Sequence, residues 1–212
     1  VVAVLPGRTD RRVLVGGHID SLNLRADAVT GRAPGANDDA SGTAVAMELA
    51  RVMARKEWEN TLVFVCFSGE EQGLLGSRAY VNQHLSGPQN QQARNKFSGY
   101  LNLDNGAMPI YGFYLEGNQA IRPIMQRYLE PFKELGATVL TMQGIGATDH
   151  LSFRQEGLPG FQAIHDYRNY DVHTHHTNMD TNDHGDEQAL RQGSVVMASI
   201  LYHAAMRNEK MP

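Results

Sequence analysis

The clearest pattern in the chain is an uninterrupted apolar run that ends on two acidic residues. The run Thr61–Phe67 carries no charge and is rich in β-branched and aromatic side chains, which is typical of a strand buried on both faces. A Ser-Gly pair ends the run, and Glu70 and Glu71 follow at once. Ligands of open α/β sheets bind just beyond the carboxyl ends of the strands, so this pair stands where a functional site is expected. A solvated acidic turn is the alternative.

Similar apolar segments recur along the chain and alternate with segments of helical period. The predicted strands are Val1–Leu5, Arg12–Gly16, Thr61–Phe67, Tyr100–Leu103, Tyr111–Leu115, Thr138–Met142 and Pro159–Ile164. The predicted helices are Ala40–Arg55, Leu74–Leu85, Gln119–Leu135, Leu151–Gln155 and Asp186–Met206. We expect the first two strands to form a hairpin or to lie side by side, and the polar segment Gln89–Asn95 to be an exposed loop. Strands that alternate with helices indicate an α/β fold.

Length and composition exclude several classes of protein. A chain of 212 residues, 42% hydrophobic, is long enough for one domain with a sizeable core, so we expect a single domain over residues 1–212. A net charge of −4 with only 19 basic residues argues against a nucleic-acid-binding face. No apolar run approaches the ~18 residues needed to span a membrane. Cys66 is the sole cysteine, which excludes an intrachain disulfide and a cysteine zinc site.

Acidic and imidazole side chains follow several of the predicted strands. His18 and Asp20 end the second strand, where residues two apart in an extended chain share a face. Asp38 and Asp39 precede the first long helix, and helix capping would account for one of the two. Asp104 follows the fourth strand, although Asp-Asn-Gly is also common turn chemistry.

The segment His165–His184 holds five of the nine histidines, a density that is typical of metal binding. Carboxylates and imidazoles without thiolates suit zinc, cobalt or manganese, and ligands from several strand ends suggest more than one ion.

Six segments of the chain carry a resemblance to a known family. GGHIDS, PGANDDASG, FSGEEQGLLGS, NLDN, TDHLSF and HTNMDT, in that order, resemble the M28 family of co-catalytic zinc peptidases, which includes aminopeptidases and plasma glutamate carboxypeptidase-like enzymes. The resemblance covers nearly the whole chain. It implies a three-layer α/β/α sandwich around a mostly parallel mixed sheet. The chain starts within a strand and without an initiator Met, so we expect it to lack the N-terminal part of such a domain.

The resemblance also implies a role for each motif residue. Two divalent ions, expected to be Zn²⁺, would be held by five ligands, with Asp38 bridging the ions. The five ligands are His18, Asp38, Glu71, Asp104 and His176. Glu70 matches the general base, and Asp20 matches a carboxylate behind the first histidine ligand.

Some assignments in the last two motifs stay open. His173, His175 and His176 compete for the last ligand position, and His176 alone keeps the His-Thr-x-x-Asp spacing to Asp180, a residue that would fix the loop of that ligand. His150, beside Asp149, either points toward the substrate or belongs to a helix cap.

These features predict a hydrolase that cleaves peptides, with a water shared by the two ions and Glu70 as its base. Glu70, Asp149 and Asp166 favour a free substrate ammonium, so an aminopeptidase leads. A carboxypeptidase or dipeptidase would need a cation, such as Arg154 or Arg168. A glutaminyl cyclase, or a scaffold domain without activity, is a further alternative. We expect a secreted or periplasmic protein with a peptide as its partner.

Overall fold

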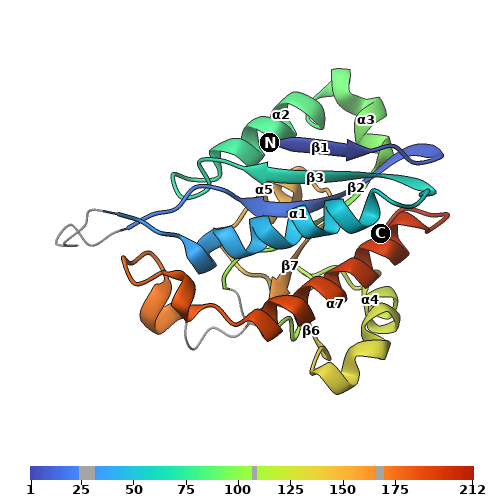
Figure 1. Cartoon of the computed structure of the whole chain (residues 1–212). Coiled ribbons are helices and arrows are strands. Elements are labelled where there is room, and N and C mark those ends of the chain that lie inside the picture. Colours follow the sequence, from blue (N-terminus) through green and yellow to red (C-terminus); the bar gives the residue numbers. More distant parts are fainter. Residues whose placement is uncertain (24–31, 107–108, 166–169) are drawn as a thin grey trace.

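The computed structural model describes residues 1–23, 32–106, 109–165 and 170–212, and its centre is a sheet of seven strands in the order β1-β3-β2-β4-β7-β5-β6 (Figure 1). The strands are β1 (Val2–Leu5), β2 (Thr9–His18), β3 (Asn60–Phe67), β4 (Phe97–Asn102), β5 (Gly112–Tyr114), β6 (Val139–Thr141) and β7 (Gly160–Ile164). β3, β2, β4 and β7 run parallel, and β5 runs parallel to β6, whereas β1 and β5 are antiparallel to their neighbours β3 and β7. The predicted α/β class with a mostly parallel mixed sheet is confirmed.

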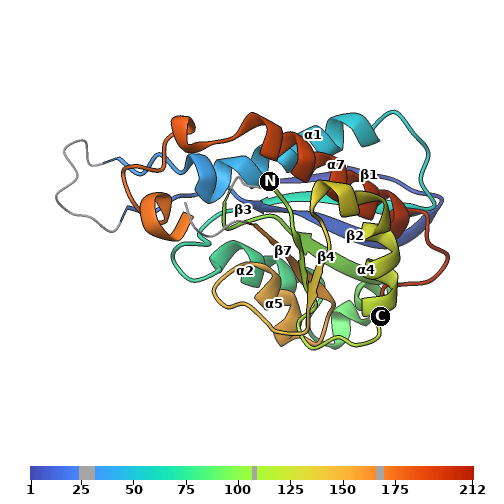
Figure 2. The same cartoon turned by 90° about the horizontal axis from the view of Figure 1, so that it is seen from below.

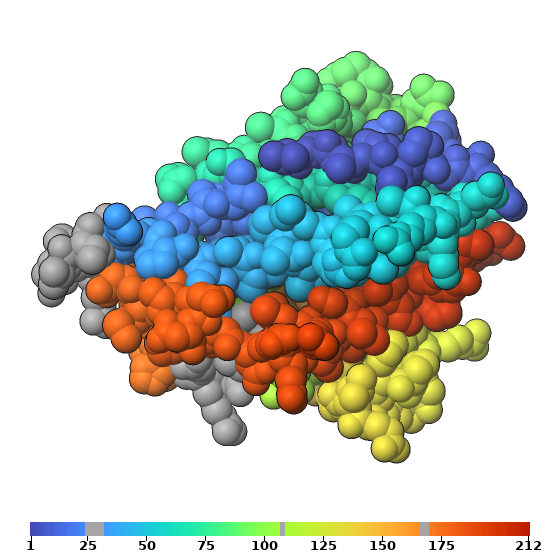
Figure 3. Space-filling model, viewed as in Figure 1, coloured from blue at the N-terminus to red at the C-terminus, as the bar shows by residue number. Residues whose placement is uncertain are grey.

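Helices cover both faces of this sheet. They are α1 (Ser41–Met53), α2 (Leu75–His84), α3 (Gln91–Lys96), α4 (Arg122–Leu129), α5 (His150–Gln155) and α7 (Glu187–Ala205). Figure 2 shows α1 and α7 on one side of the sheet and α2 and α5 on the other. On the first side α1 and α7 lie next to each other across the surface (Figure 3). The three-layer α/β/α arrangement is therefore confirmed.

Alternating side chains of the central strands supply a hydrophobic core on each face. Val13 and Val15 of β2 pack in the core beneath α1, α4 and α7, whereas Leu14 packs with α2 and α5 on the opposite face. Residues of β3 alternate in the same way, because successive side chains of a strand point to opposite faces. Burial on both faces explains why the apolar run of β3 contains no charge.

The first two strands are not neighbours, so both the predicted hairpin and the predicted side-by-side arrangement are wrong. β3 lies between them, with Val2 opposite Val65 on one side and Val13 opposite Leu62 on the other. β1 is mostly exposed and occupies the edge of the sheet, which is tolerable for a short strand. β3, buried on both faces, takes the interior position.

The polar segment Gln89–Asn95, predicted as a loop, is largely helical. A 3₁₀ turn over Pro88–Asn90 leads into α3, and the side-chain amide of Asn90 donates to the carbonyls of Gln83 and Ser86. Neither element buries a residue fully, so no apolar period was present to reveal them.

The sheet topology determines where the site can form. β2, β3 and β4 are parallel neighbours, so their carboxyl ends meet at one edge of the sheet. His18 is the last residue of β2 and lies opposite Phe67, the last residue of β3. None of the helices formed by the described residues has the length and apolar character needed to cross a membrane.

Candidate metal centre and active site

The strand ends bring His18 into the middle of a group of carboxylates. The side chain of His18 is 1% exposed, and its Nε2 lies 3.1 Å from Asp38 Oδ1 and 3.6 Å from Asp104 Oδ1. Glu70 Oε2 is 4.0 Å from the same nitrogen. Residues that are 20 or more positions apart in sequence thus converge on one imidazole nitrogen.

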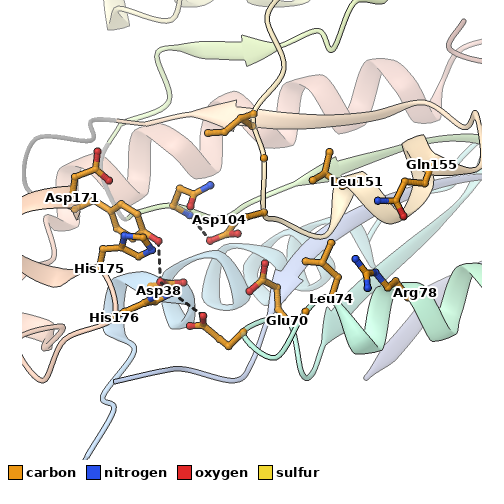
Figure 4. Close-up of a pocket in the computed structure, with 17 residues that line it drawn as sticks. Asp38, Glu70, Leu74, Arg78, Asp104, Leu151, Gln155, Asp171, His175 and His176 are labelled. Carbon is orange, nitrogen blue, oxygen red and sulfur yellow. Dashed lines mark hydrogen bonds and ion pairs between the residues drawn. The ribbon is translucent and has the colours of Figure 1, made fainter. Parts of the chain in front are cut away.

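A second imidazole lies near the other carboxylate oxygen of Asp38. His176 Nε2 lies 3.4 Å from Asp38 Oδ2 and 2.7 Å from Glu71 Oε2. Asp38 therefore stands between two groups of side chains, with one oxygen directed to each. The five residues predicted as metal ligands all lie in this cluster, and Glu70 lies beside them (Figure 4).

The cluster has the properties of a site for cations. His18 Nε2 and Glu71 Oε1 are buried and have no hydrogen-bond partner in the described part of the chain, although buried polar atoms are normally paired. Burial and the carboxylate of Asp104 raise the pKa of Glu70 to about 9, and burial and Asp38 raise that of Glu71 to about 8. Positive charge would relieve both effects, and imidazole and carboxylate ligands are those that zinc accepts.

Two sets of ligand atoms lie close enough together to share an ion each. His18, Asp38 and Asp104 offer atoms within 4.8 Å of one another, and so do Asp38, His175 and His176. Of the neighbouring histidines, His176 is the one that contacts Glu71, whereas His175 is exposed and stacks on Tyr170 with ring centroids 4.7 Å apart. This geometry favours His176 as the ligand and leaves His175 at the rim.

The side chains of Asp38 and Asp39 make different contacts. The carboxylate of Asp39 turns away from the cluster and accepts hydrogen bonds from the backbone N–H of His18 and of Gly42, each at 3.0 Å. Gly42 lies in the first turn of α1, so Asp39 serves the helix start, as capping predicts for one of the pair. Asp38 is left for the cluster.

Asp180 holds the backbone that carries Asp38. Its two carboxylate oxygens accept from the backbone N–H of Asn37 at 2.8 Å and of Asp38 at 2.9 Å. We predicted that it would fix the loop of the last ligand, His176. In the structure it ties that loop to the turn that carries Asp38, so one residue positions both segments.

Asp20 braces two elements of the site. The backbone carbonyl of Asp20 is 3.0 Å from His18 Nδ1, so a proton on Nδ1 leaves Nε2 free to face the cluster. The carboxylate of Asp20 accepts from the backbone N–H of Glu70 and of Glu71, each at 3.2 Å. The carboxylate is 3.7 Å from Nδ1, so it acts mainly on the glutamates and only secondarily on His18.

Tyr170 is a residue of the site that sequence reasoning missed. It is buried, and its hydroxyl donates to Asp38 Oδ2 at 2.8 Å. Burial and the charge of Asp38 raise the pKa of this phenol, so it keeps its proton and acts as a donor. No motif marks Tyr170, and its place within the histidine-rich segment was the one available signal.

His150, Asp149 and Arg154, which were also predicted, do not line the cavity. His150 is fully buried and pairs with Glu116 at 3.0 Å, so it does not point toward a substrate. Asp149 is fully buried at the start of α5 and does not line the cavity. Arg154 is bound by Glu116 through its side chain and backbone. Asp166 and Arg168 lie outside the described residues.

A cavity of about 640 Å³ opens over the cluster (Figure 4). Asp171 and His175 lie at one end, and Leu74, Arg78 and Gln155 lie at the other, with the cluster between them. A volume of this size is in the range of sites that bind small molecules or short peptides.

Comparison with known proteins places this site in a family. Leucine aminopeptidase 1 of Leptosphaeria maculans is 30% identical over an alignment that covers 99% of this chain and 56% of that protein. The chain spans about half the length of the curated relatives it matches.

Solved structures share the fold. A peptidase M28 precursor from Shewanella amazonensis matches with a TM-score of 0.82 and 25% identity, covering 100% of this chain and 45% of that one. A zinc aminopeptidase from Bacillus subtilis matches with a TM-score of 0.76 and 24% identity, covering 98% and 50%, which shows a common fold.

The model of peptidase family M28 matches residues 1–200 of the 212 in the chain. This match covers every strand and every residue of the cluster. The chain therefore belongs to peptidase family M28.

Proposed function

We propose that the protein is a zinc-dependent aminopeptidase that hydrolyses the first peptide bond of its substrates. The observation that carries the proposal is the position of Asp38, which offers one oxygen to the His18 group and the other to the His176 group, beside Glu70 and beneath an open cavity. The zinc aminopeptidase of the same fold supports the choice of metal.

Two ions account for the ligand set better than one. His18 and Asp104 would hold the first ion, Glu71 and His176 the second, and Asp38 both. Three carboxylates then offset most of the four positive charges, and a deprotonated water would supply the remainder. When bound, the ions would lower the pKa of a water between them and polarise the substrate carbonyl.

Glu70 is positioned to move the proton. It lines the cavity, is 7% exposed, and has its backbone fixed by Asp20. Burial and Asp104 raise its pKa in the metal-free chain, and bound cations would lower it again, which would leave Glu70 ionised and able to accept a proton from water. The water oxygen adds to the carbonyl carbon, the C–N bond breaks, and Glu70 delivers the proton to the leaving nitrogen.

The charges along the cavity favour a substrate with a free amino group. Asp171 and Glu70 are acidic residues of the cavity wall that the ligand set does not use, and Asp171 lies at the end away from Arg78. Negative charge there favours an ammonium over a carboxylate. Asp149 does not line the cavity, but its charge acts on Glu70, so it adds to the negative charge of the site without contacting a substrate.

The proposal is tested with one dipeptide that is free or acetylated at its amino end and free or amidated at its carboxyl end. Acetylation should cost on the order of 2–5 kcal/mol in transition-state binding, because an ion pair or metal contact is lost. Equal cleavage of the free and acetylated forms, with no cleavage of the amidated form, would instead show a carboxypeptidase. Cyclisation of peptides that begin with Gln would show a glutaminyl cyclase.

A matched pair of variants ties the activity to the site. Glu70→Gln keeps the shape of the side chain and should lose turnover while it retains the metal. Glu134→Gln, an exposed residue on the opposite side of the sheet from α2, should match the wild type in both respects. Full activity in Glu70→Gln would contradict the proposed base.

A further inference from the structure

The two ends of the cavity differ in charge. Asp171 lies at one end, Glu70 lies beside the metal ligands, and Leu74, Arg78 and Gln155 line the other end (Figure 4). Arg78 is the one Lys or Arg side chain among the described residues that line this cavity. The end beyond the general base is therefore apolar next to Glu70 and cationic farther out.

The spacing of Glu70, Leu74 and Arg78 explains this arrangement. The backbone N–H of Leu74 donates to the carbonyl of Glu70 at 2.8 Å, and that of Arg78 donates to Leu74 at 3.0 Å. Leu74 has a left-handed backbone (φ 60°) and directly precedes α2, Arg78 lies in the first turn of that helix, and Glu70, Leu74 and Arg78 all line the cavity. Helical side chains lean toward the N-terminal end of their helix, so the guanidinium of Arg78 leans toward Leu74 and Glu70.

Arg78 has no partner in the part of the chain that the structure describes. Its exposed side chain makes neither a hydrogen bond nor an ion pair there, whereas Arg154 is held by Glu116. Arg78 and Gln155 also line a neighbouring hollow of about 360 Å³. The guanidinium therefore stands between two open volumes with all its donors available to a ligand.

The position of the base identifies which part of a substrate reaches Arg78. Glu70 gives its proton to the leaving nitrogen, so the residue that leaves must lie on the Glu70 side of the cluster. That side continues to Leu74 and Arg78 (Figure 4). A carboxylate on the leaving residue would meet the guanidinium after passing an apolar wall.

We propose that Arg78, assisted by Gln155, binds a carboxylate of the leaving residue and so makes the protein selective for substrates that carry one. The inference rests on the proposed function. Two sources present the same chemistry: the terminal carboxylate of a dipeptide, and an acidic side chain immediately after the cleaved bond. Both would place a negative charge within reach of the same fork of donors.

The test compares kcat/KM for matched substrates in the zinc-loaded chain. Leu-Gly against Leu-Gly-amide measures the terminal carboxylate, and Leu-Glu-amide against Leu-Gln-amide measures the side chain. In at least one pair, the wild-type kcat/KM should be about three- to tenfold higher for the substrate with the carboxylate than for its uncharged partner. The ratio is modest because Arg78 is exposed. Arg78→Gln should lose that preference, and Arg78→Lys should keep part of it.

Two controls separate this inference from the proposed function. Leucine p-nitroanilide carries no carboxylate, so its cleavage reports the proposed function, and Arg78→Gln should lose much less kcat/KM on it than on the carboxylate substrates. Arg122→Gln removes another exposed arginine, on α4, and should leave every preference unchanged. Binding can be compared in the same way. Calorimetric titration of the zinc-loaded Glu70→Gln variant gives the Kd of each substrate in the two pairs.

Each outcome decides the inference. A carboxylate preference that Arg78→Gln abolishes supports it, and the pair that shows the preference identifies the source. Cleavage of leucine p-nitroanilide by the wild type, with no carboxylate preference or with one that survives in Arg78→Gln, overturns the role of Arg78 and leaves the proposed function standing. If no leucine substrate is cleaved, the proposed function fails and this inference fails with it.

Discussion

The proposed metal site has two halves, His18 with Asp104 and Glu71 with His176, and they are built on different kinds of backbone. His18 and Asp104 stand at the ends of parallel strands and are 1% and 4% exposed. His176 lies in an irregular segment, has a left-handed φ of 53°, and has a side chain that is 24% exposed. The strand-borne half is fixed by the register of the sheet. In the other half, called loop-borne here, Glu71 follows β3 and its N–H is held by Asp20, whereas His176 depends on the loop that Asp180 ties to Asp38.

This difference predicts two cation sites of unequal strength that share one ligand. A rigid, buried half should bind its ion more tightly, because less ordering is needed on binding. The loop-borne half should lose its ion first on dilution or with a chelator. Variants can separate the two halves, because Asp38 belongs to both, whereas each of the other proposed ligands belongs to one.

Asp38→Ala should give the largest effect, because it removes the ligand common to both halves. We expect metal content to fall below one ion per chain and kcat/KM to fall by at least about three orders of magnitude. Elemental analysis after desalting, together with a leucine p-nitroanilide assay, measures both. An Asp38→Ala protein that still binds two ions would show that the halves are independent.

His176→Ala should remove one ion and keep the other, whereas His18→Ala should disturb the tighter half. Zinc titration of the metal-free wild type should therefore show two steps, of which His176→Ala loses the weaker. The His175→Ala variant is the matched control and should retain both steps, because His175 lies at the rim. Loss of the second ion in His175→Ala rather than in His176→Ala would reverse the ligand assignment.

Asp180→Asn should weaken the loop-borne half from a distance. One of its amide positions cannot accept a hydrogen bond, so one of the backbone N–H groups of Asn37 and Asp38 is left unpaired, at a cost of about 1–3 kcal/mol in unfolding free energy. Metal affinity should fall by roughly 10- to 100-fold, as for other residues that orient ligands. Asp183→Asn, an exposed residue of the same segment, is the control and should change neither.

Removing the metal should make stability depend on pH. In the metal-free chain the pKa values of Glu70 and Glu71 are raised to about 9 and about 8, from 4.5 when unfolded, so the folded chain binds protons that the unfolded chain releases. The contribution of these two groups to the free energy of unfolding is fully present below about pH 4.5 and is lost as the pH rises to about 9.

Calorimetry with a chelator should thus show a melting temperature that falls from pH 5 to pH 9. With zinc the trend should weaken or reverse, because metal binding is favoured when the ligands are deprotonated. A metal-free melting temperature that rises over this range would contradict the crowding of carboxylates on which the metal assignment depends.

Tyr170→Phe should give the smallest effect. It deletes the hydroxyl that donates to Asp38 but keeps the buried ring, so kcat/KM should fall by roughly tenfold or less. Tyr202→Phe, in the last helix, is the control. A loss as large as that of Asp38→Ala would mean that Tyr170 contacts the reacting groups directly.

The sequence was most informative where one local rule decides the structure. The uncharged run before Glu70 predicted a buried strand, and its parallel neighbours then placed His18 and Asp104 at the same edge. The order of β1 and β3 could not be predicted in this way, because pairing depends on competition among strands far apart in sequence. The polar helix α3 was missed because it has no buried face.

Within the site, residue types were easier to predict than contacts. The two acids before α1 were assigned one cap and one site residue, but only the folded backbone shows that Asp39 reaches back to His18. Tyr170 and Arg78 carry no motif, and their contribution depends on where the chain returns in space. Motifs reveal ligands, whereas the residues that orient ligands or bind substrates come from tertiary packing.

The most direct test of the shared carboxylate is a crystal structure of the zinc-loaded chain with anomalous scattering measured at the zinc edge. We predict two peaks, one beside His18 and Asp104 and one beside Glu71 and His176, with an oxygen of Asp38 bound to each. Their separation should be the ~3.5–4 Å that is general for two-metal hydrolases, aminopeptidases included. A single peak at full zinc saturation, or a second peak that Asp38 does not touch, would contradict the account.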